Sequence, residues 1–231
     1  MLLTRRIVYD APNKPGPPLR FVTHSHRVQE LAQRLGWFPA ARYTNLRDVK
    51  RFDGCLGFLD IDWRNYCFRR HLEAARLTRP LITVARDIVD RRRIYETLDE
   101  AEELSNFARF IVIVPKDKRL QHDLEHEIPS KFLLGFSVPT RYGGTEIPPE
   151  AFKRPVHLLG GRPEVQRRFA RVLKVFSMDC NRFTLDAAFG DYFDGTIFRP
   201  HPTGGYERCL KDSLRNIDAL WSGYTRPVLE G

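Results

Sequence analysis

Short apolar runs alternate with longer amphipathic stretches along most of the chain. The runs are four to seven residues long and rich in Val, Ile, Leu or Phe. Because apolar residues follow one another directly within a run, each run is typical of a strand that is buried on both faces. The pattern predicts eight strands, over Leu19–Thr23, Gly57–Ile61, Pro80–Ala85, Phe110–Val114, Phe132–Val138, Pro155–Leu159, Lys174–Met178 and Gly195–Phe198.

Between these runs, apolar residues recur at the spacing of one helix face. Val28, Leu31, Ala32 and Leu35 fall at positions i, i+3, i+4 and i+7. The same spacing predicts further helices over Tyr66–Leu77, Ile94–Leu104, Leu120–Leu124, Val165–Val172 (opened by Pro163), Phe183–Phe189 and Tyr206–Trp221.

Regular alternation of strand and helix implies a parallel sheet with right-handed crossovers. Eight such units favour a compact α/β fold, a (β/α)8 TIM-type barrel, over a doubly wound open sheet. No GxGxxG or Walker motif follows any predicted strand, which argues against the nucleotide-binding form of the open sheet. The sequence thus predicts an N-terminal extension over residues 1–18, with its proline-rich segment APNKPGPP, and a single catalytic barrel domain over 19–231.

Composition and charge narrow the class of protein further. Apolar residues make up 42% of the 231 residues, and 38 Lys and Arg against 29 Asp and Glu give a net charge of +9. This balance favours a polyanion such as nucleic acid as partner, although a basic solvated surface has the same signature. No apolar run approaches the roughly 18 residues of a membrane span, and MLLTRRIVYDAP lacks the apolar core of a signal peptide. We therefore expect a cytoplasmic protein with no membrane partner.

The cysteines and histidines do not predict a metal site. Cys55, Cys67, Cys180 and Cys209 form no CxxC or CxC pair, and the histidines form no HExxH or HxH motif that carboxylates support. We expect reduced thiols, no metal and no cofactor.

Carboxylates close three of the predicted strands. Asp60 and Asp62 end the second run, Asp87 follows the third, and Asp179 ends the seventh. Any one of them could simply cap a helix. In a barrel, however, the carboxyl ends of all strands meet at one mouth, where paired carboxylates suit glycosidic chemistry.

Glycines and arginines also gather near the strand ends. Gly135, Gly160 and Gly161 either turn the chain or let a flat ligand approach the backbone. Many arginines lie near the aromatic residues Trp63, Tyr66, Phe68 and Tyr142, which is compatible either with a nucleic-acid track or with solvated helix faces. The candidate phosphate contacts are Arg86, Lys116, Arg141, Arg162 and Arg182.

Several of these segments, taken in order, resemble the tRNA-guanine transglycosylase superfamily. PVHLLGGRPEVQRRFARVLKVFSMDCNR is similar to the family's late-barrel segment, where a glycine turn leads through a helix to a strand ending in Asp-Cys. LLGFSVPTRYGG resembles its Gly-Gly-Leu-Ser-Val-Gly loop. VARDIVD and LDIDW stand where the family places its base-reading Asp and its first catalytic Asp. The resemblance covers roughly residues 55–220.

The sequence departs from the family pattern at positions that bear on which nucleic acid receives the new base. The CxCxxC…H zinc site is missing, Asp-Ile-Asp-Trp replaces Asp-Ser-Gly-Gly, and Pro115-Lys116-Asp117 replaces the Gln-Gly-Gly loop. The chain is also much shorter than the tRNA enzymes. It therefore looks more like the divergent, often phage-encoded relatives that insert 7-deazaguanines into DNA, for which the site of action would be the host cytoplasm and the purpose resistance to restriction.

The resemblance implies a pentosyltransferase that works by double displacement. Asp179 would attack C1′ of a target guanosine. Asp60 would transfer protons, and Asp62 is the alternative residue for this role. A 7-deazaguanine such as preQ0 would then replace guanine. The base would be bound by Asp87, by backbone groups at Gly135 and Phe136, and by Leu159 and Gly160.

Two other functions fit the same residues. A barrel hydrolase that cleaves an N- or O-glycosidic bond with water would use the same carboxylates. A non-catalytic nucleic-acid-binding protein would explain the charge, although strand-end carboxylates would repel phosphate. The pattern leaves the oligomeric state undetermined.

Overall fold

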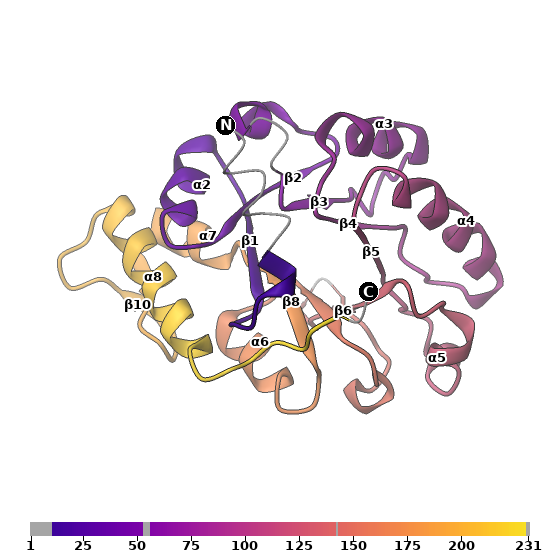
Figure 1. The fold of residues 1–231 in the computed structure, drawn as a ribbon. Coiled ribbons are helices and arrows are strands. Elements are labelled where there is room, and N and C mark those ends of the chain that lie inside the picture. Colours follow the sequence, from indigo (N-terminus) through magenta and orange to yellow (C-terminus); the bar gives the residue numbers. More distant parts are fainter. Residues whose placement is uncertain (1–10, 53–55, 142, 230–231) are drawn as a thin grey trace.

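Eight parallel strands close into a barrel in the computed structural model, which describes residues 11–52, 56–141 and 143–229 (Figure 1). Each strand pairs with the next along the chain, and β1 also pairs with β8 to close the ring. The strands are β1 (Leu19–Thr23), β2 (Phe38–Arg42), β3 (Phe58–Asp60), β4 (Ile82–Val84), β5 (Phe110–Ile113), β6 (Leu133–Ser137), β7 (Val156–Leu159) and β8 (Val175–Asp179). The predicted TIM-type fold is confirmed.

Helices surround the strands in Figure 1, as the amphipathic stretches predict. The helix α8 illustrates the cause, because it buries Cys209, Leu210, Leu214, Ile217 and Trp221 along one face. Pro163 occupies the first turn of α6, where its missing N–H costs no hydrogen bond. The α-helices are α2 (His26–Gln33), α3 (Phe68–Thr78), α4 (Ile94–Ser105), α5 (Leu124–Glu127), α6 (Pro163–Phe169), α7 (Arg182–Ala188) and α8 (Tyr206–Trp221).

Short 3₁₀ turns complete the connections. They are η1 (Ala11–Asn13), η2 (Arg47–Phe52), η3 (Arg91–Arg93), η4 (Lys118–Leu120) and η5 (Pro149–Ala151). Among the described residues, the links from β2 to β3 and from β6 to β7 carry only η2 and η5 and no α-helix, so the barrel is not a uniform series of strand–helix units.

The predicted number of barrel strands is correct, but one of the predicted segments is not a barrel strand. The strand β2 was not predicted, because its sequence FPAAR carries a proline and two alanines, which are uncommon in strand interiors. Residues 195–198 are outside the barrel. Phe198 instead opens β10 (Phe198–Pro200), which pairs antiparallel with β9 (Asp191–Phe193) between α7 and α8. Asp179 therefore closes the eighth barrel strand rather than the seventh.

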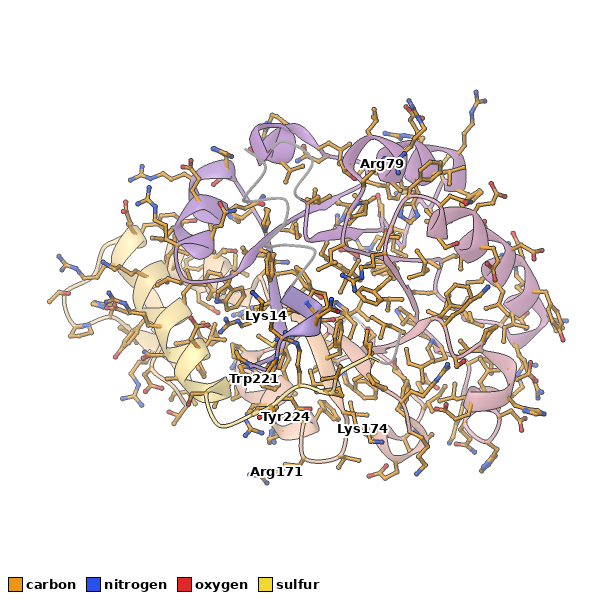
Figure 2. All side chains as sticks on the ribbon, in the orientation of Figure 1. Lys14, Arg79, Arg171, Lys174, Trp221 and Tyr224 are labelled. Atoms are coloured by element: carbon orange, nitrogen blue, oxygen red, sulfur yellow. The ribbon has the colours of Figure 1, made fainter. Side chains whose placement is uncertain are left out.

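The N-terminal end of the barrel is covered by the two ends of the described chain. The Arg226 backbone N–H donates to the Gly16 carbonyl at 2.9 Å, and its guanidinium donates to the carbonyls of Pro17 and Lys14. Figure 2 shows Trp221 and Tyr224 in the same region as Lys14, where the chain leaves α8. The Tyr224 hydroxyl accepts from the backbone N–H of Val175 at 2.7 Å. These contacts leave the opposite, carboxyl-end mouth for a site.

None of the described helices is both long enough and apolar enough to span a bilayer. Cys67, Cys180 and Cys209 are free thiols, while Cys55 and the aromatic Tyr142 lie outside the described residues.

We predict that Arg226→Ala lowers the free energy of unfolding by about 1–3 kcal/mol, because it removes the charged donor to two carbonyls from a nearly buried position. Urea denaturation of the variant beside Lys211→Ala, a change at an exposed site on α8, checks this. Equal midpoints for the two variants would contradict the role assigned to Arg226.

Candidate active site

The carboxyl ends of the strands enclose a cavity of about 340 Å³ at the barrel mouth. Asp60 ends β3, Asp87 follows β4, and Asp179 ends β8, and all three line this cavity. Parallel pairing places every strand's carboxyl end at the same rim, so residues more than a hundred positions apart in sequence meet there. The cavity is also lined by Arg42, Trp63, Lys116, Ser137, Val138, Leu159, Gly160, Gly161 and Asn181, among others.

Asp179 is the most constrained of the three carboxylates. Its Oδ1 accepts a hydrogen bond from the Gly160 backbone N–H at 2.9 Å, and Asp179 as a whole is 8% exposed. The buried Gln166 side chain donates to the carbonyls of both Gly160 and Asp179, each at 2.8 Å, which ties the ends of β7 and β8 together. The adjacent Cys180 thiol is fully buried, and burial raises its pKa to about 12, so it is a poor nucleophile near neutral pH. Asp179 is therefore the nucleophile candidate at this strand end.

The environment of Asp60 raises the pKa of its carboxyl group into the neutral range. Burial, and then the negative charge of Asp179, raise the pKa of Asp60 to about 7, against a weaker opposing effect of the Ile61 N–H bond at 2.8 Å and of Arg42. A carboxyl with such a pKa is suited to general acid–base catalysis. Asp62 does not line the cavity, because its carboxylate turns to accept from the Arg64 backbone N–H at 3.3 Å.

Asp87 and Lys116 form an ion pair within the cavity. The Lys116 Nζ lies 2.7 Å from Asp87 Oδ2, and both side chains are mostly buried. Burial raises the pKa of Asp87, and the Lys116 ammonium opposes that shift. Lys116 also lies 5.9 Å from the ring centre of Trp63, which is 54% exposed beside the cavity. The end of the cavity thus offers one cation, one carboxylate and one aromatic face.

The predicted base-binding residues divide between the cavity and the core. Leu159 and Gly160 line the cavity, whereas Gly135 and Phe136 do not. A Cβ at Gly135 would lie 2.7 Å from methyl carbons of both Val112 and Val114, so this glycine is required by packing inside the barrel. The Phe136 ring packs against Phe152 and Phe169, in the layer between strands and helices. In β6, it is Ser137 and the following Val138 that reach the cavity.

The predicted phosphate contacts also divide. Lys116 faces Asp87, as described. Arg86 pairs with Glu96 and Glu100 of α4, and Arg182 makes a two-pronged ion pair with Asp186 at 2.6 Å, so neither lines the cavity. Arg162 is exposed after β7. Arg141 is exposed in the turn between Thr140 and Gly143, two residues that do line the cavity.

Arg42 and Asn181 are two of the cavity residues that the sequence pattern did not predict. Arg42 ends β2, the strand that was not predicted, and it pairs in register with Asp60 on β3. Asn181 follows Asp179 and accepts from the Thr23 backbone N–H at 2.7 Å, and only a fold in which β1 meets β8 makes that contact. Among the described residues, no three His, Cys, Asp or Glu side chains are grouped to hold a metal.

The chain matches the profile of a "Family of unknown function (DUF6610)" over residues 32–222. No curated protein matches the sequence of this chain. Among solved structures, the YdjI aldolase from Escherichia coli K12 aligns with a TM-score of 0.56 at 12% identity, covering 95% of this chain and 97% of the aldolase. At this identity the similarity shows a shared barrel fold.

We predict that Asp60→Asn stabilises the protein above pH 7 by about 1–4 kcal/mol and has little effect near pH 4. In the unfolded chain Asp60 ionises near pH 4, whereas in the folded protein its pKa is about 7. The wild type therefore loses stability as the pH rises between these values, and asparagine removes that loss. Chemical denaturation at pH 4 and pH 8, with Asp62→Asn as control, measures the difference. A gain that is the same at both pH values would refute the assignment.

Proposed function

The chain belongs to the family of unknown function DUF6610, and we propose that it exchanges guanine in nucleic acid for a 7-deazaguanine such as preQ0. The observation that carries the proposal is the convergence of Asp60, Asp87 and Asp179 on one cavity of about 340 Å³. These three residues are the ones that the resemblance to guanine transglycosylases selects, and they come from three different strands.

The proposed reaction needs no group beyond these side chains and the two bases. An Asp179 carboxylate oxygen attacks C1′ of the target nucleoside, the C1′–N9 bond breaks, and its electron pair leaves with guanine. Asp60 in its protonated form gives a proton to the departing base. It then takes the N9 proton of the incoming 7-deazaguanine, whose N9 attacks C1′ and displaces Asp179. A carboxyl with a pKa of about 7 can serve in both directions.

The Asp87–Lys116 pair suits the edge of a 6-oxopurine. Guanine offers an acceptor at O6 beside donors at N1 and N2, and the pair offers the complementary ammonium and carboxylate 2.7 Å apart. Adenine presents the opposite order and would be rejected. We therefore assign Lys116 to the base rather than to a phosphate, and Trp63 to stacking on its face.

Nucleic acid, with DNA favoured, is the proposed acceptor. Arg42, Arg141 and Arg162 are exposed on strand-end segments, and the chain carries a net charge of +9. Backbone phosphates would bind these guanidinium groups while the target base leaves its stack and enters the cavity. Arg86 and Arg182 are omitted from this set because their guanidinium groups already pair with carboxylates.

We predict that Asp179→Asn and Asp179→Ala abolish exchange of labelled guanine into DNA while DNA binding persists. The amide keeps the size of the side chain but is a poor nucleophile. Denaturing electrophoresis of the wild type without incoming base should show a protein–DNA adduct that both variants lack. Asp60→Asn should slow exchange by about 10²- to 10⁴-fold. Exchange by Asp179→Ala would dismiss this nucleophile, and net base loss without an adduct would identify a hydrolase instead.

We further predict that Lys116→Met lowers kcat/KM for a 6-oxo base by about 10- to 100-fold, because a charged hydrogen bond to O6 is lost. The change should be much smaller for 2-amino-7-deazapurine, which lacks that oxygen. Lys118→Met, at an exposed neighbouring site, is the control. An equal loss for both bases would show that Lys116 does not recognise O6.

A further inference from the structure

A polar chain runs into the barrel beneath Asp179. His157 on β7 and Ser177 on β8 stand opposite each other in the strand register, and Asp179 lies two residues beyond Ser177 on the same face of β8. His157 and Ser177 are both 0% exposed. A histidine at this depth is costly unless its ring nitrogens are used, so its partners define its role.

The imidazole ring of His157 is fixed in one orientation. It stacks on Phe58 of β3 with ring centres 4.7 Å apart, and the ring of Phe21 on β1 lies 6.0 Å away. Its Nδ1 lies 2.8 Å from the Ser177 hydroxyl. The β7–β8 pairing shifts register between Val156 and His157, and such irregularities commonly redirect a side chain next to a functional site.

The second ring nitrogen points to the nucleophile candidate. His157 Nε2 lies 3.6 Å from Asp179 Oδ1, and it has no hydrogen-bond partner within the described part of the chain. Asp179 Oδ1 is the same oxygen that accepts the Gly160 N–H at 2.9 Å. Catalytic contacts are often long in a structure without substrate and shorten when it binds.

We propose that His157 is a positioning residue for Asp179, with its proton on Nε2 and with Nδ1 accepting from the Ser177 hydroxyl. In this tautomer, Nε2–H faces Oδ1, which also accepts from the Gly160 N–H, so Oδ2 remains the oxygen that is available for attack. His157 does not line the cavity, and it therefore acts through Asp179 rather than on the substrate. The assignment of the tautomer rests on the geometry alone, whereas the consequence for catalysis rests on the proposed function.

The tautomer is measured directly by ¹⁵N NMR of the histidine-labelled protein, with His157→Phe identifying the signals. We expect protonated Nε2 and unprotonated Nδ1 at neutral pH, and a shift of population toward Nδ1–H in Ser177→Ala. A resting Nδ1–H form or a doubly protonated ring would overturn the proposal. This measurement needs no enzymatic activity, so it decides the inference even if no base exchange occurs and the proposed function fails.

Kinetics test the consequence for Asp179. His157→Phe retains an aromatic ring but no donor, and it should slow formation of the protein–DNA adduct by about 10- to 100-fold at unchanged KM for DNA. His157→Gln can again present an N–H and should recover most of that rate, which a purely structural role would not explain. Adduct formation within twofold of wild type in His157→Phe, or equal losses in both variants, would overturn the proposal.

Discussion

Closure of the parallel sheet is the constraint on which the site depends. Because β1 pairs with β8 as well as with β2, no strand of the barrel has an open edge, and all eight carboxyl ends surround one axis. Asp60 and Asp179, which lie far apart in sequence, are brought close enough that the charge of Asp179 raises the pKa of Asp60. An open sheet with the same strands would spread these ends along an edge.

Bringing three carboxylates together in a partly buried cavity creates repulsion that the structure offsets in different ways. Asp87 is paired with Lys116, Asp179 accepts a backbone N–H from Gly160, and Asp60 holds its proton up to about pH 7. The differences in environment give three chemically identical side chains three different capacities. One is suited to attack, one to proton transfer and one to recognition of a polar ligand edge.

The layer beneath the cavity makes this arrangement rigid. Gln166 joins the backbones of Gly160 and Asp179, while His157 and Ser177 place polar atoms between Asp179 and the apolar interior. Gly135 leaves room for the side chains of Val112, Val114 and Leu159, which pack together and close the floor of the cavity. Groups outside the cavity lining therefore determine where the carboxylate oxygens of the cavity lie.

Local sequence determined the elements whose pattern is strong and self-contained. Runs apolar on successive residues, such as VFSM before Asp179, become strands because only burial on both faces accommodates them, and the amphipathic spacing of Tyr206–Trp221 produces α8. The same runs located Asp60, Asp87 and Asp179, since each lies at the end of a strand or within three residues after it.

Only the tertiary structure decided the rest. The sequence of β2 has a weak strand propensity, and the strand forms because it lies between two strands of strong propensity, so Arg42 at its end was not predicted. Residues 195–198 form part of a hairpin, although their apolar pattern resembles that of a barrel strand. Whether a side chain faces the cavity or a neighbour depends on contacts distant in sequence. The carboxylates of Glu100 and Asp186 pair with Arg86 and Arg182 outside the cavity, whereas Lys116 pairs with Asp87 within it. His157 is one polar residue within the apolar run Pro155–Leu159, and only the register with Ser177 places its Nε2 near Asp179.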